Sequence, residues 1–266
     1  MVTTMMSSVD KALALLRHFT VQNPELGLSE LARIAGYDKT TTLRCMTALQ
    51  RNDFVEQDIH SRKYRLGLAP ISLAQIREQS FPVQAVLKRH LDLLCQDIGE
   101  TAHATLVIGD DFMTAGISEP DRALRVHVDP SGALPLHATA SGIAIAAFMP
   151  PEVQIAMIAR QKFEKYTGET PETADQVHKQ LTQTRASGIG RAFQTYEIDV
   201  VGTAAPIFNA SRVPIGAIAI AAVSMRLTPA LQKQIDDKLI ASADMITREL
   251  GGMKPAKTPE GEETPK

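Results

Sequence analysis

Two helix-end signals stand only two positions apart near the start of the chain. Gly36 is typical of the residue that follows a helix, and Asp38 is typical of an N-cap. Ser29 has the same capping chemistry, and Leu31 and Ile34 after it have helical spacing. The sequence therefore predicts a short helix capped by Ser29, a tight turn, and a further helix after Asp38, which together indicate a helix-turn-helix.

The helix predicted after Asp38 has two chemically different faces. Leu43, Met46 and Leu49 share one face, which we expect to pack on the rest of the domain. The opposite face carries short polar and basic side chains, namely Thr40, Arg44, Thr47 and Arg51. Such a division is typical of a helix that lies in the major groove of DNA and recognises base edges.

Elements on both sides complete a small domain. A helix capped by Ser8 is predicted before the turn, with Val9 and Leu13 on its apolar stripe. After the helix-turn-helix, residues 54–56 and 64–66 are predicted strands. The tip between these strands carries the basic side chains Arg62 and Lys63. This arrangement predicts a winged helix-turn-helix.

The remainder of the chain predicts a second domain. Residues 68–79 form a predicted connecting helix, and Pro82 interrupts it before a long apolar helix at 83–98. Further strands are predicted at 105–109, 112–117, 124–127, 201–208 and 215–223, and further helices at 140–148, 151–159, 174–187 and 229–250. This order predicts an α+β fold with a mostly antiparallel sheet in the second domain. The expected divisions are a DNA-binding domain at 1–67, a linker helix at 68–80, an effector-binding domain at 81–251 and a disordered tail at 252–266.

Charge and cysteine content narrow the class of protein. Residues 1–80 carry ten Lys and Arg against eight Asp and Glu, whereas the remainder carries eighteen against twenty-two. A weakly basic first part is compatible with binding a polyanion. Cys45 and Cys95 are too few for a disulfide scaffold, and residues 1–8 lack the features of a signal peptide. No apolar run is long enough to span a bilayer, so we expect a soluble cytoplasmic protein with no membrane partner.

Several segments resemble the IclR family of bacterial transcriptional regulators. In the first half these are Leu28-Ser29-Glu30-Leu31-Ala32, Lys39-Thr40-Thr41-Thr42-Leu43-Arg44 and Tyr64-Arg65-Leu66-Gly67. In the second half they are residues 134–142, which resemble the family's effector loop, 203–208 and 226–228. The likeness extends over about residues 8–250. It implies a GAF-like effector domain, dimers or dimers of dimers, and control of a nearby operon for small-metabolite catabolism or transport.

The expected DNA contacts lie on the second and third helices and at the hairpin tip. Arg44 suits a bidentate pair with guanine, and threonine methyl groups suit thymine. Lys39 and Ser29 suit phosphate groups, and the hairpin tip suits the backbone or the minor groove. The expected DNA-binding residues are Ser29, Lys39, Thr40, Thr41, Arg44, Thr47, Arg62 and Lys63.

The resemblance also implies a small-molecule pocket beneath the loop at 134–141. Its expected lining is Leu106, Leu136, Thr139, Ala140, Ser141, Ala192, Gly202, Thr203, Ala219 and Ala221. Four of these positions are small where the family often has polar groups: Ala192, Gly202, Ala219 and Ala221. Because small side chains enlarge a cavity and lower its polarity, we hypothesise a partly apolar effector such as an aromatic acid, a lactone or a short acyl compound. The alternative is that these residues only pack the core, or that the domain binds no ligand.

Other classes of function have less support. The chain lacks a Gly-x-Ser-x-Gly elbow, a phosphate loop and a dinucleotide fingerprint, so we expect no enzyme. An enzyme acting on a small metabolite, and an interaction protein that has lost DNA binding, are the alternatives. His103, His127 and His137 match no metal-ligand motif, and we expect neither a metal nor a cofactor. The expected partners are double-stranded operator DNA, an effector, and further copies of the chain packed through Leu68, Ile71, Leu73 and Ile76.

Overall fold

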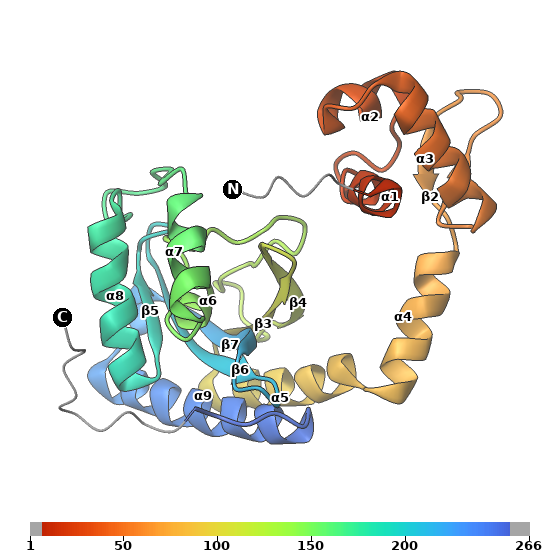
Figure 1. Ribbon diagram of the computed structural model, residues 1–266. Helices are drawn as coiled ribbons and strands as arrows, with labels where there is room; N and C mark the ends of the chain where they lie inside the picture. The colour runs from red at the N-terminus through yellow and green to blue at the C-terminus, as the bar shows by residue number, and fades with distance from the viewer. Residues whose placement is uncertain (1–6, 256–266) are drawn as a thin grey trace. The chain divides into compact units, whose positions relative to one another are not determined.

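The computed structural model describes residues 7–255, and the chain divides into two compact units between Pro82 and Val83 (Figure 1). The first unit contains α1 (Ser8–Leu16), α2 (Leu28–Ala35), α3 (Lys39–Arg51), β1 (Val55–Gln57), β2 (Tyr64–Leu66) and α4 (Ala69–Ser80). The second contains α5 (Val83–Ile98), β3 (Thr101–Ile108), β4 (Asp111–Ser118), α6 (Ala140–Ala146), α7 (Pro151–Ala159), α8 (Ala174–Ser187), β5 (Gly190–Phe193), β6 (Val200–Phe208), β7 (Pro214–Val223), η1 (Ser224–Arg226) and α9 (Pro229–Glu249). The predicted α+β class is confirmed.

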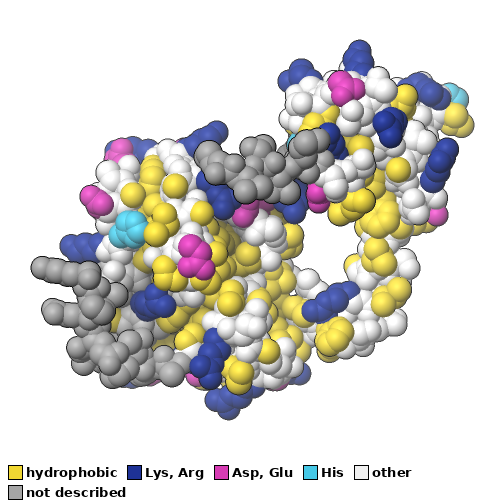
Figure 2. All heavy atoms as spheres, in the orientation of Figure 1, with side chains coloured by type: hydrophobic (Ala, Val, Ile, Leu, Met, Phe, Trp, Pro, Cys, Tyr) yellow, Lys and Arg dark blue, Asp and Glu magenta, His cyan; other side chains and the backbone are white. Residues whose placement is uncertain are grey.

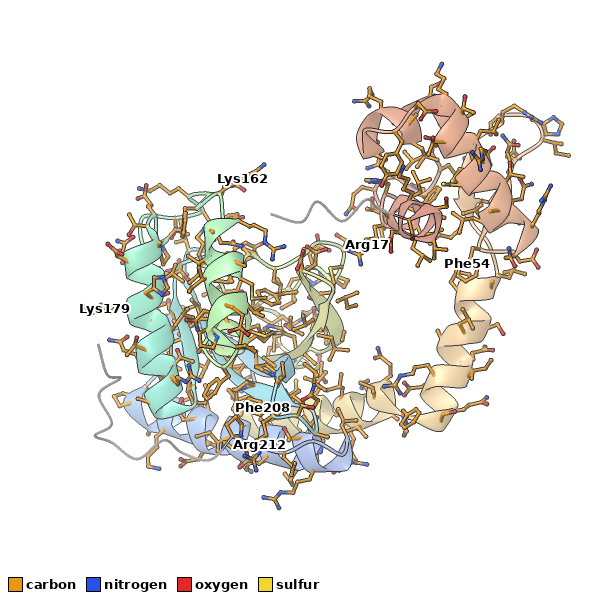
Figure 3. All side chains as sticks on the ribbon, in the orientation of Figure 1. Arg17, Phe54, Lys162, Lys179, Phe208 and Arg212 are labelled. Atoms are coloured by element: carbon orange, nitrogen blue, oxygen red, sulfur yellow. The ribbon has the colours of Figure 1, made fainter. Side chains whose placement is uncertain are left out.

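Three helices and a hairpin enclose the core of the first unit. Leu15 of α1, Leu31 of α2 and Met46 of α3 are fully buried there. Phe54, which Figure 3 labels, packs against this core at the start of the hairpin. Tyr64 of β2 exchanges two backbone hydrogen bonds with Leu26, which lies in the loop between α1 and α2. These bonds attach the hairpin to this loop. The first unit is the predicted winged helix-turn-helix.

The turn between α2 and α3 has the predicted chemistry, but α2 begins earlier than expected. Gly36 follows α2 with a φ of +69°, a conformation that favours glycine, and Asp38 caps α3 through its side chain. The predicted cap of α2 is wrong. The carbonyl of Gly27 accepts the first hydrogen bond of the helix, so Ser29 is an exposed residue inside the first turn.

The buried face of α3 is rotated from the predicted one. Met46 and Leu49 are buried as expected, but their companions are Thr42 and Cys45. Leu43 is 46% exposed, so its predicted packing role is wrong. At 100° per residue the four buried positions form one band, and Leu43 lies outside it at the edge of the opposite face.

Similar errors affect the other two helices of this domain. Ser7, and not Ser8, caps α1 in a capping box. Val9 and Leu13 are exposed although the sequence pattern places them on the apolar stripe, and Ile34 in α2 is exposed as well. Residues three and four positions from a buried residue lie on nearly the same face of a helix. Spacing alone therefore cannot distinguish an exposed apolar residue at the edge of the buried face from a core residue.

Within the described residues, five strands of the second unit form one antiparallel sheet in the order β4-β3-β7-β6-β5. α5 and α9 cover one face, and α6 lies on the other with α8 against it (Figure 1). The α5 and α9 face buries large side chains such as Ile218 and Ile220. The α6 face has small ones such as Ala219, and a Cβ on Gly190 would lie 2.5 Å from the carbonyl oxygen of Ala140. Small residues therefore let α6 approach the sheet closely.

Two predictions about the sheet are corrected. The edge strand β5 is not predicted by the sequence pattern, and the strand predicted at 124–127 is irregular instead. The Thr101 hydroxyl donates to the carbonyl of Val126 at 2.6 Å, and the Arg226 guanidinium donates to that of Leu124 at 3.2 Å. These two side chains bond carbonyls that would otherwise need a neighbouring strand. The segment at 124–127 therefore needs no strand partner.

The predicted disordered tail is wrong for its first residues. Gly252 is buried and its amide donates to the carbonyl of Thr247, and the amide of Met253 donates to that of Asn209. The rest of the predicted tail, at 256–266, lies outside the described residues. Among residues 7–255, none of the helices combines the length and hydropathy needed to span a bilayer.

A buried ion pair fixes the segment at 119–128. Glu100 is 1% exposed, and Arg226 donates to both of its carboxylate oxygens at 2.6 Å. Arg122 lies 3.7 Å from the same carboxylate. The hydrogen bonds to Glu100 raise the pKa of Arg226 above its ordinary value. Since Arg226 also bonds the carbonyl of Leu124, the pair joins η1, the start of β3 and this segment.

Replacing Arg226 is expected to lower the free energy of unfolding strongly. Arg226→Leu leaves a buried carboxylate with less compensation, and breaking such a pair costs about 3–5 kcal/mol. Lys233→Gln is the matched control, because Lys233 and Asp237 form an exposed pair that contributes about 0.5 kcal/mol or less. Denaturant unfolding followed by circular dichroism measures both. Equal losses in the two variants would contradict the assignment of Glu100 and Arg226 as a buried pair.

Candidate functional site

The outer face of α3 is held in place by the cap at its start. The carboxylate of Asp38 accepts the amide of Thr41 at 2.8 Å and its hydroxyl at 2.7 Å. These hydrogen bonds, the backbone one first, lower the pKa of Asp38 below its ordinary value, so the cap is ionised at neutral pH. The hydroxyl of Thr41 therefore serves the cap, whereas Thr40 and Arg44 remain exposed on the outer face.

The hairpin tip presents its basic residues on a tight turn. The carboxylate of Asp58 accepts the amides of His60 and Ser61 at 3.0 and 2.6 Å, and these bonds, led by that from Ser61, lower its pKa. Arg62 adopts a φ of +59° at the end of this turn, and both Arg62 and Lys63 are exposed. Figure 2 shows Lys and Arg side chains spread over the first unit. All eight residues predicted to contact DNA are at least partly exposed, and they lie on α2, on α3 and at this tip.

The second unit contains a cavity of about 250 Å³ between the small-residue face of the sheet, the start of α6 and two loops. Its lining combines small apolar residues with a few polar ones: His103, Val126, His127, Val128, Asp129, Leu134, Ala138, Thr139, Ala140, Ser141, Ala192, Tyr196, Glu197, Val200, Gly202 and Ala221. This volume is close to the lower end of the range for small-molecule sites and suits a ligand of about one ring.

The floor of the cavity is a row of small residues across three strands. Ala192 of β5 pairs with Gly202 of β6, which pairs with Ala221 of β7. Directly paired residues of an antiparallel sheet point to the same side, so all three face the cavity. A Cβ on Gly202 would lie 3.1 Å from the Cβ of Ala140, so the missing side chain serves both the cavity and the close approach of α6.

Four of the ten residues predicted to line the pocket do not line it. Leu106 and Thr203 point to the opposite face of the sheet, where Leu106 packs against the α5 and α9 core and Thr203 accepts a hydrogen bond from α9. Ala219 is on the correct face but is fully covered, and Leu136 is buried in the core between α6 and α8. The other six line the cavity as predicted: Thr139, Ala140, Ser141, Ala192, Gly202 and Ala221.

The sequence analysis did not select His103, which is the main polar group of the cavity floor. Its Nε2 lies 3.5 Å from the hydroxyl of Ser141, and its Nδ1 is buried without a hydrogen-bond partner among the described residues. Burial lowers the pKa of His103 to about 4, so the ring is neutral at physiological pH. Its pairing with Ala219 places it on the same face as the predicted lining, and the register of β3 and β7 that creates this pairing is not contained in the sequence pattern.

The pair of Ser141 and His103 does not form a hydrolytic site. A nucleophilic serine needs a basic histidine that a third group orients. Here the Nδ1 of His103 has no orienting partner in the described part of the chain, and a pKa of about 4 makes the ring a weak base. The two side chains instead offer a neutral donor and acceptor to a bound ligand.

The mouth of the cavity is acidic. Asp129 and Glu197 are exposed and line it, and no Lys or Arg is among the lining residues described. A hydrogen bond from the Ser131 side chain lowers the pKa of Asp129, so this carboxylate is ionised at neutral pH. His127 lies 2.9 Å from the carboxylate of Glu119. The imidazole of His127 is therefore already engaged by a carboxylate.

The three histidines that match no metal-ligand motif in the sequence do not all lie at one site. His103 and His127 line the same cavity, but His137 packs against Phe163 and bonds the carbonyl of Glu164 at 2.9 Å. Across residues 7–255, no three His, Cys, Asp or Glu side chains are arranged to hold a metal ion.

A winged helix-turn-helix joined to a domain with a ligand-sized cavity defines a DNA-binding transcriptional regulator. Residues 8–58 match the family described as the IclR helix-turn-helix domain, and residues 77–248 match the one described as bacterial transcriptional regulator IclR C-terminal. The chain belongs to the IclR family of bacterial transcriptional regulators, which confirms the resemblance seen in the sequence.

Individual relatives agree in length and fold. The chain is 26% identical over 254 residues to the transcriptional repressor IclR of Escherichia coli K12, covering 95% of this chain and 93% of that protein. An IclR transcriptional regulator from Silicibacter sp. TM1040 shares 33% identity and a TM-score of 0.90, covering 95% of this chain and all of the other. An IclR homologue from Microbacterium hydrocarbonoxydans, solved in complex with 4-hydroxybenzoate, has the same fold at 20% identity and a TM-score of 0.72, covering 92% and 99% of the two chains. The Escherichia coli and Silicibacter proteins are both named as transcriptional regulators, as the sequence predicts.

The neutral state of His103 predicts a specific loss of stability in acid. An unfolded histidine has a pKa near 6.5, whereas folded His103 has one of about 4. Between these values the unfolded chain binds a proton that the folded chain does not, so stability falls as the pH falls, by up to about 1.4 kcal/mol per pH unit. His103→Asn should make the decline between pH 6.5 and 4.5 shallower in urea titrations. Identical slopes for the two proteins would contradict a buried neutral ring.

Proposed function

We propose that the chain binds double-stranded operator DNA through α3 and the hairpin tip, and that a small molecule in the second unit changes its affinity for the operator. We infer that it acts in the cytoplasm and controls a neighbouring operon for the catabolism or transport of a small metabolite. The observation that carries the proposal is the outer face of α3, which is exposed, polar and basic while the inner face alone holds the helix.

The proposed contacts divide into base recognition and backbone positioning. Arg44 pairs with a guanine, with Thr40 and Thr47 beside it on the outer face. Lys39 and Ser29 lie near the starts of α3 and α2, where they are suited to phosphate groups. The hairpin tip, with Arg62 and Lys63, contacts the backbone or the minor groove next to the base contacts.

Binding to the DNA upstream of its own gene is expected to weaken steeply with salt, because each neutralised phosphate contributes a slope of about −0.9 in log affinity against log salt. Arg44→Ala should weaken this binding by about ten-fold or more, since a bidentate guanine pair contributes about 1–3 kcal/mol. Lys179→Ala is the control, because this exposed lysine lies on α8 in the second unit (Figure 3). Fluorescence anisotropy across a salt series measures all three proteins. Salt-independent binding, or equal affinities for the three, would contradict the proposal.

For the second unit we propose a partly apolar organic acid or lactone as the effector. Its polar end bonds the hydroxyl of Ser141 and the amides of Ala140 and Ser141 at the start of α6, whereas the Thr139 hydroxyl already caps the amide of Gly142. Its apolar body lies on the row of Ala192, Gly202 and Ala221. The acidic mouth and the lack of a lining Lys or Arg disfavour dicarboxylates. That a relative of the same fold was solved with 4-hydroxybenzoate supports a ligand of this size.

Ligand class is tested by a thermal-shift screen of monocyclic aromatic acids, lactones and short acyl acids against glyoxylate and pyruvate. We expect stabilisation by the first group and little by the two small keto acids, because the apolar row gives them little contact. Ala221→Leu should abolish the shift by filling the cavity while leaving DNA binding unchanged. Stabilisation by the keto acids alone, or an unchanged shift in Ala221→Leu, would reject the proposed ligand class.

We also propose that the chain forms a homodimer, or a dimer of dimers, through α4. No residue of α4 is buried within the chain, and Figure 2 shows hydrophobic side chains along this helix. Leu68, Ile71, Leu73 and Ile76 are all more than half exposed. At 100° per residue they point to more than one side of the helix, so a partner has to contact α4 on several sides rather than along the single stripe expected.

Charged residues on α4 are expected to separate the subunits. Ile71→Glu combined with Ile76→Glu puts two carboxylates in the proposed interface, so the mass from light scattering should fall to that of a monomer. Ile155→Glu on α7 is the matched control, since Ile155 is as exposed as these residues. A mass unchanged by the double substitution would show that α4 is not the interface.

A further inference from the structure

We propose that Leu43 recognises the C5-methyl group of a thymine in the major groove and so contributes to operator specificity. The inference rests on the proposed DNA-binding function of α3. It adds a specific contact, between Leu43 and a thymine, which DNA binding in general does not require.

Leu43 has no packing role that accounts for a leucine at this position. It is 46% exposed, while the buried band of α3 is formed by Thr42, Cys45, Met46 and Leu49. Thr42 is the polar residue of this buried band, and its hydroxyl donates to the carbonyl of Asp38 at 2.9 Å. The buried hydroxyl therefore has a hydrogen-bond partner at the start of the helix. The helix is therefore docked without Leu43.

The neighbours of Leu43 are the residues proposed to contact bases. Thr40 precedes it by three positions and Thr47 follows it by four, so both adjoin it on the helix surface, and Arg44 is next in the chain. Thr40, Leu43 and Arg44 lie in the first two turns of α3, the part of such a helix that contacts base edges, and Thr47 begins the third turn. Leu43 thus adds the largest apolar group to an otherwise polar surface.

The chemistry of the major groove leaves one good partner for such a group. Donors and acceptors of the base edges find no partner on a leucine, whereas the thymine methyl is the apolar feature of the groove. Contact between the two removes apolar surface from water, which corresponds to about three- to ten-fold in affinity for one methyl group. The structure therefore assigns to Leu43 a preference for thymine in the half-site where Arg44 pairs with guanine.

The test compares thymine with uracil, which differs only by lacking the methyl group. A randomised duplex library is first enriched with the full-length protein. Each thymine of the enriched duplex is then replaced in turn by uracil, and affinity is measured by fluorescence anisotropy. We expect one position in each half-site at which uracil weakens the wild type by about three- to ten-fold. In Leu43→Ala that difference should disappear, and in Leu43→Met, which keeps an apolar side chain, it should persist.

Ile34→Ala provides the matched control. Ile34 is 44% exposed on α2 of the same domain, and its replacement should leave the difference between thymine and uracil intact. The inference is overturned if no uracil position weakens the wild type, if Leu43→Ala keeps the difference, or if Leu43→Ala changes the mass of the protein, which would make Leu43 a contact between copies. Failure to enrich any duplex would instead overturn the proposed DNA-binding function, and the inference with it.

Discussion

The proposed DNA-binding surface depends on how α3 is docked through one band of side chains. Thr42, Cys45, Met46 and Leu49 are buried together, and they are enough to hold a helix of thirteen residues. The cap at Asp38 fixes the first turn and with it the direction of every later side chain. Because packing uses only this band, the opposite face is free to carry residues selected for DNA and not for stability.

The second unit separates stability from ligand binding by the two faces of one sheet. Successive residues of a strand point to opposite sides, so β6 and β7 send large side chains to α5 and α9 and small ones to α6 and the cavity. The face towards α5 and α9 buries large side chains, and the opposite face leaves the cavity unfilled. The buried pair of Glu100 and Arg226 then fixes the segment at 119–128, which forms one wall of the cavity. A ligand that contacts this wall contacts a segment that Thr101 and Arg226 bond at two of its carbonyls.

The sequence predicts the elements that have strong local signals. It fails where contacts with residues distant in the chain determine burial or hydrogen bonding. Gly36 and Asp38 determine the turn between α2 and α3 by backbone chemistry that needs no tertiary information. Leu43 and Ile34 look like core residues by spacing, and only the packing of the three helices reveals that they are exposed. The segment at 124–127 has a strand pattern, but its carbonyls are bonded by Thr101 and by a side chain distant in sequence, which no local pattern contains.

The candidate pocket shows the same division. The loop at 134–141 and the small residues of the floor follow from the family resemblance, and six of the ten predicted residues line the cavity. Thr203 is misassigned because it follows Gly202 in the same strand, and successive residues of a strand point to opposite faces. Leu106 is misassigned because the pairing of β3 with β7 decides which face it shares. His103 is missed for the same reason, since its place beside Ser141 depends on the pairing of β3 with β7 and on the position of α6.

The central claim is that the outer face of α3 lies in the major groove. Methylation interference with dimethyl sulfate tests it most directly, because methylation at guanine N7 blocks the major-groove edge that Arg44 is proposed to bind, whereas methylation at adenine N3 alters only the minor groove. We expect a guanine in each half-site whose N7 methylation excludes the duplex from the bound fraction. If bound and unbound duplexes carry N7 methylation equally at every guanine, α3 does not occupy the major groove and the account is wrong.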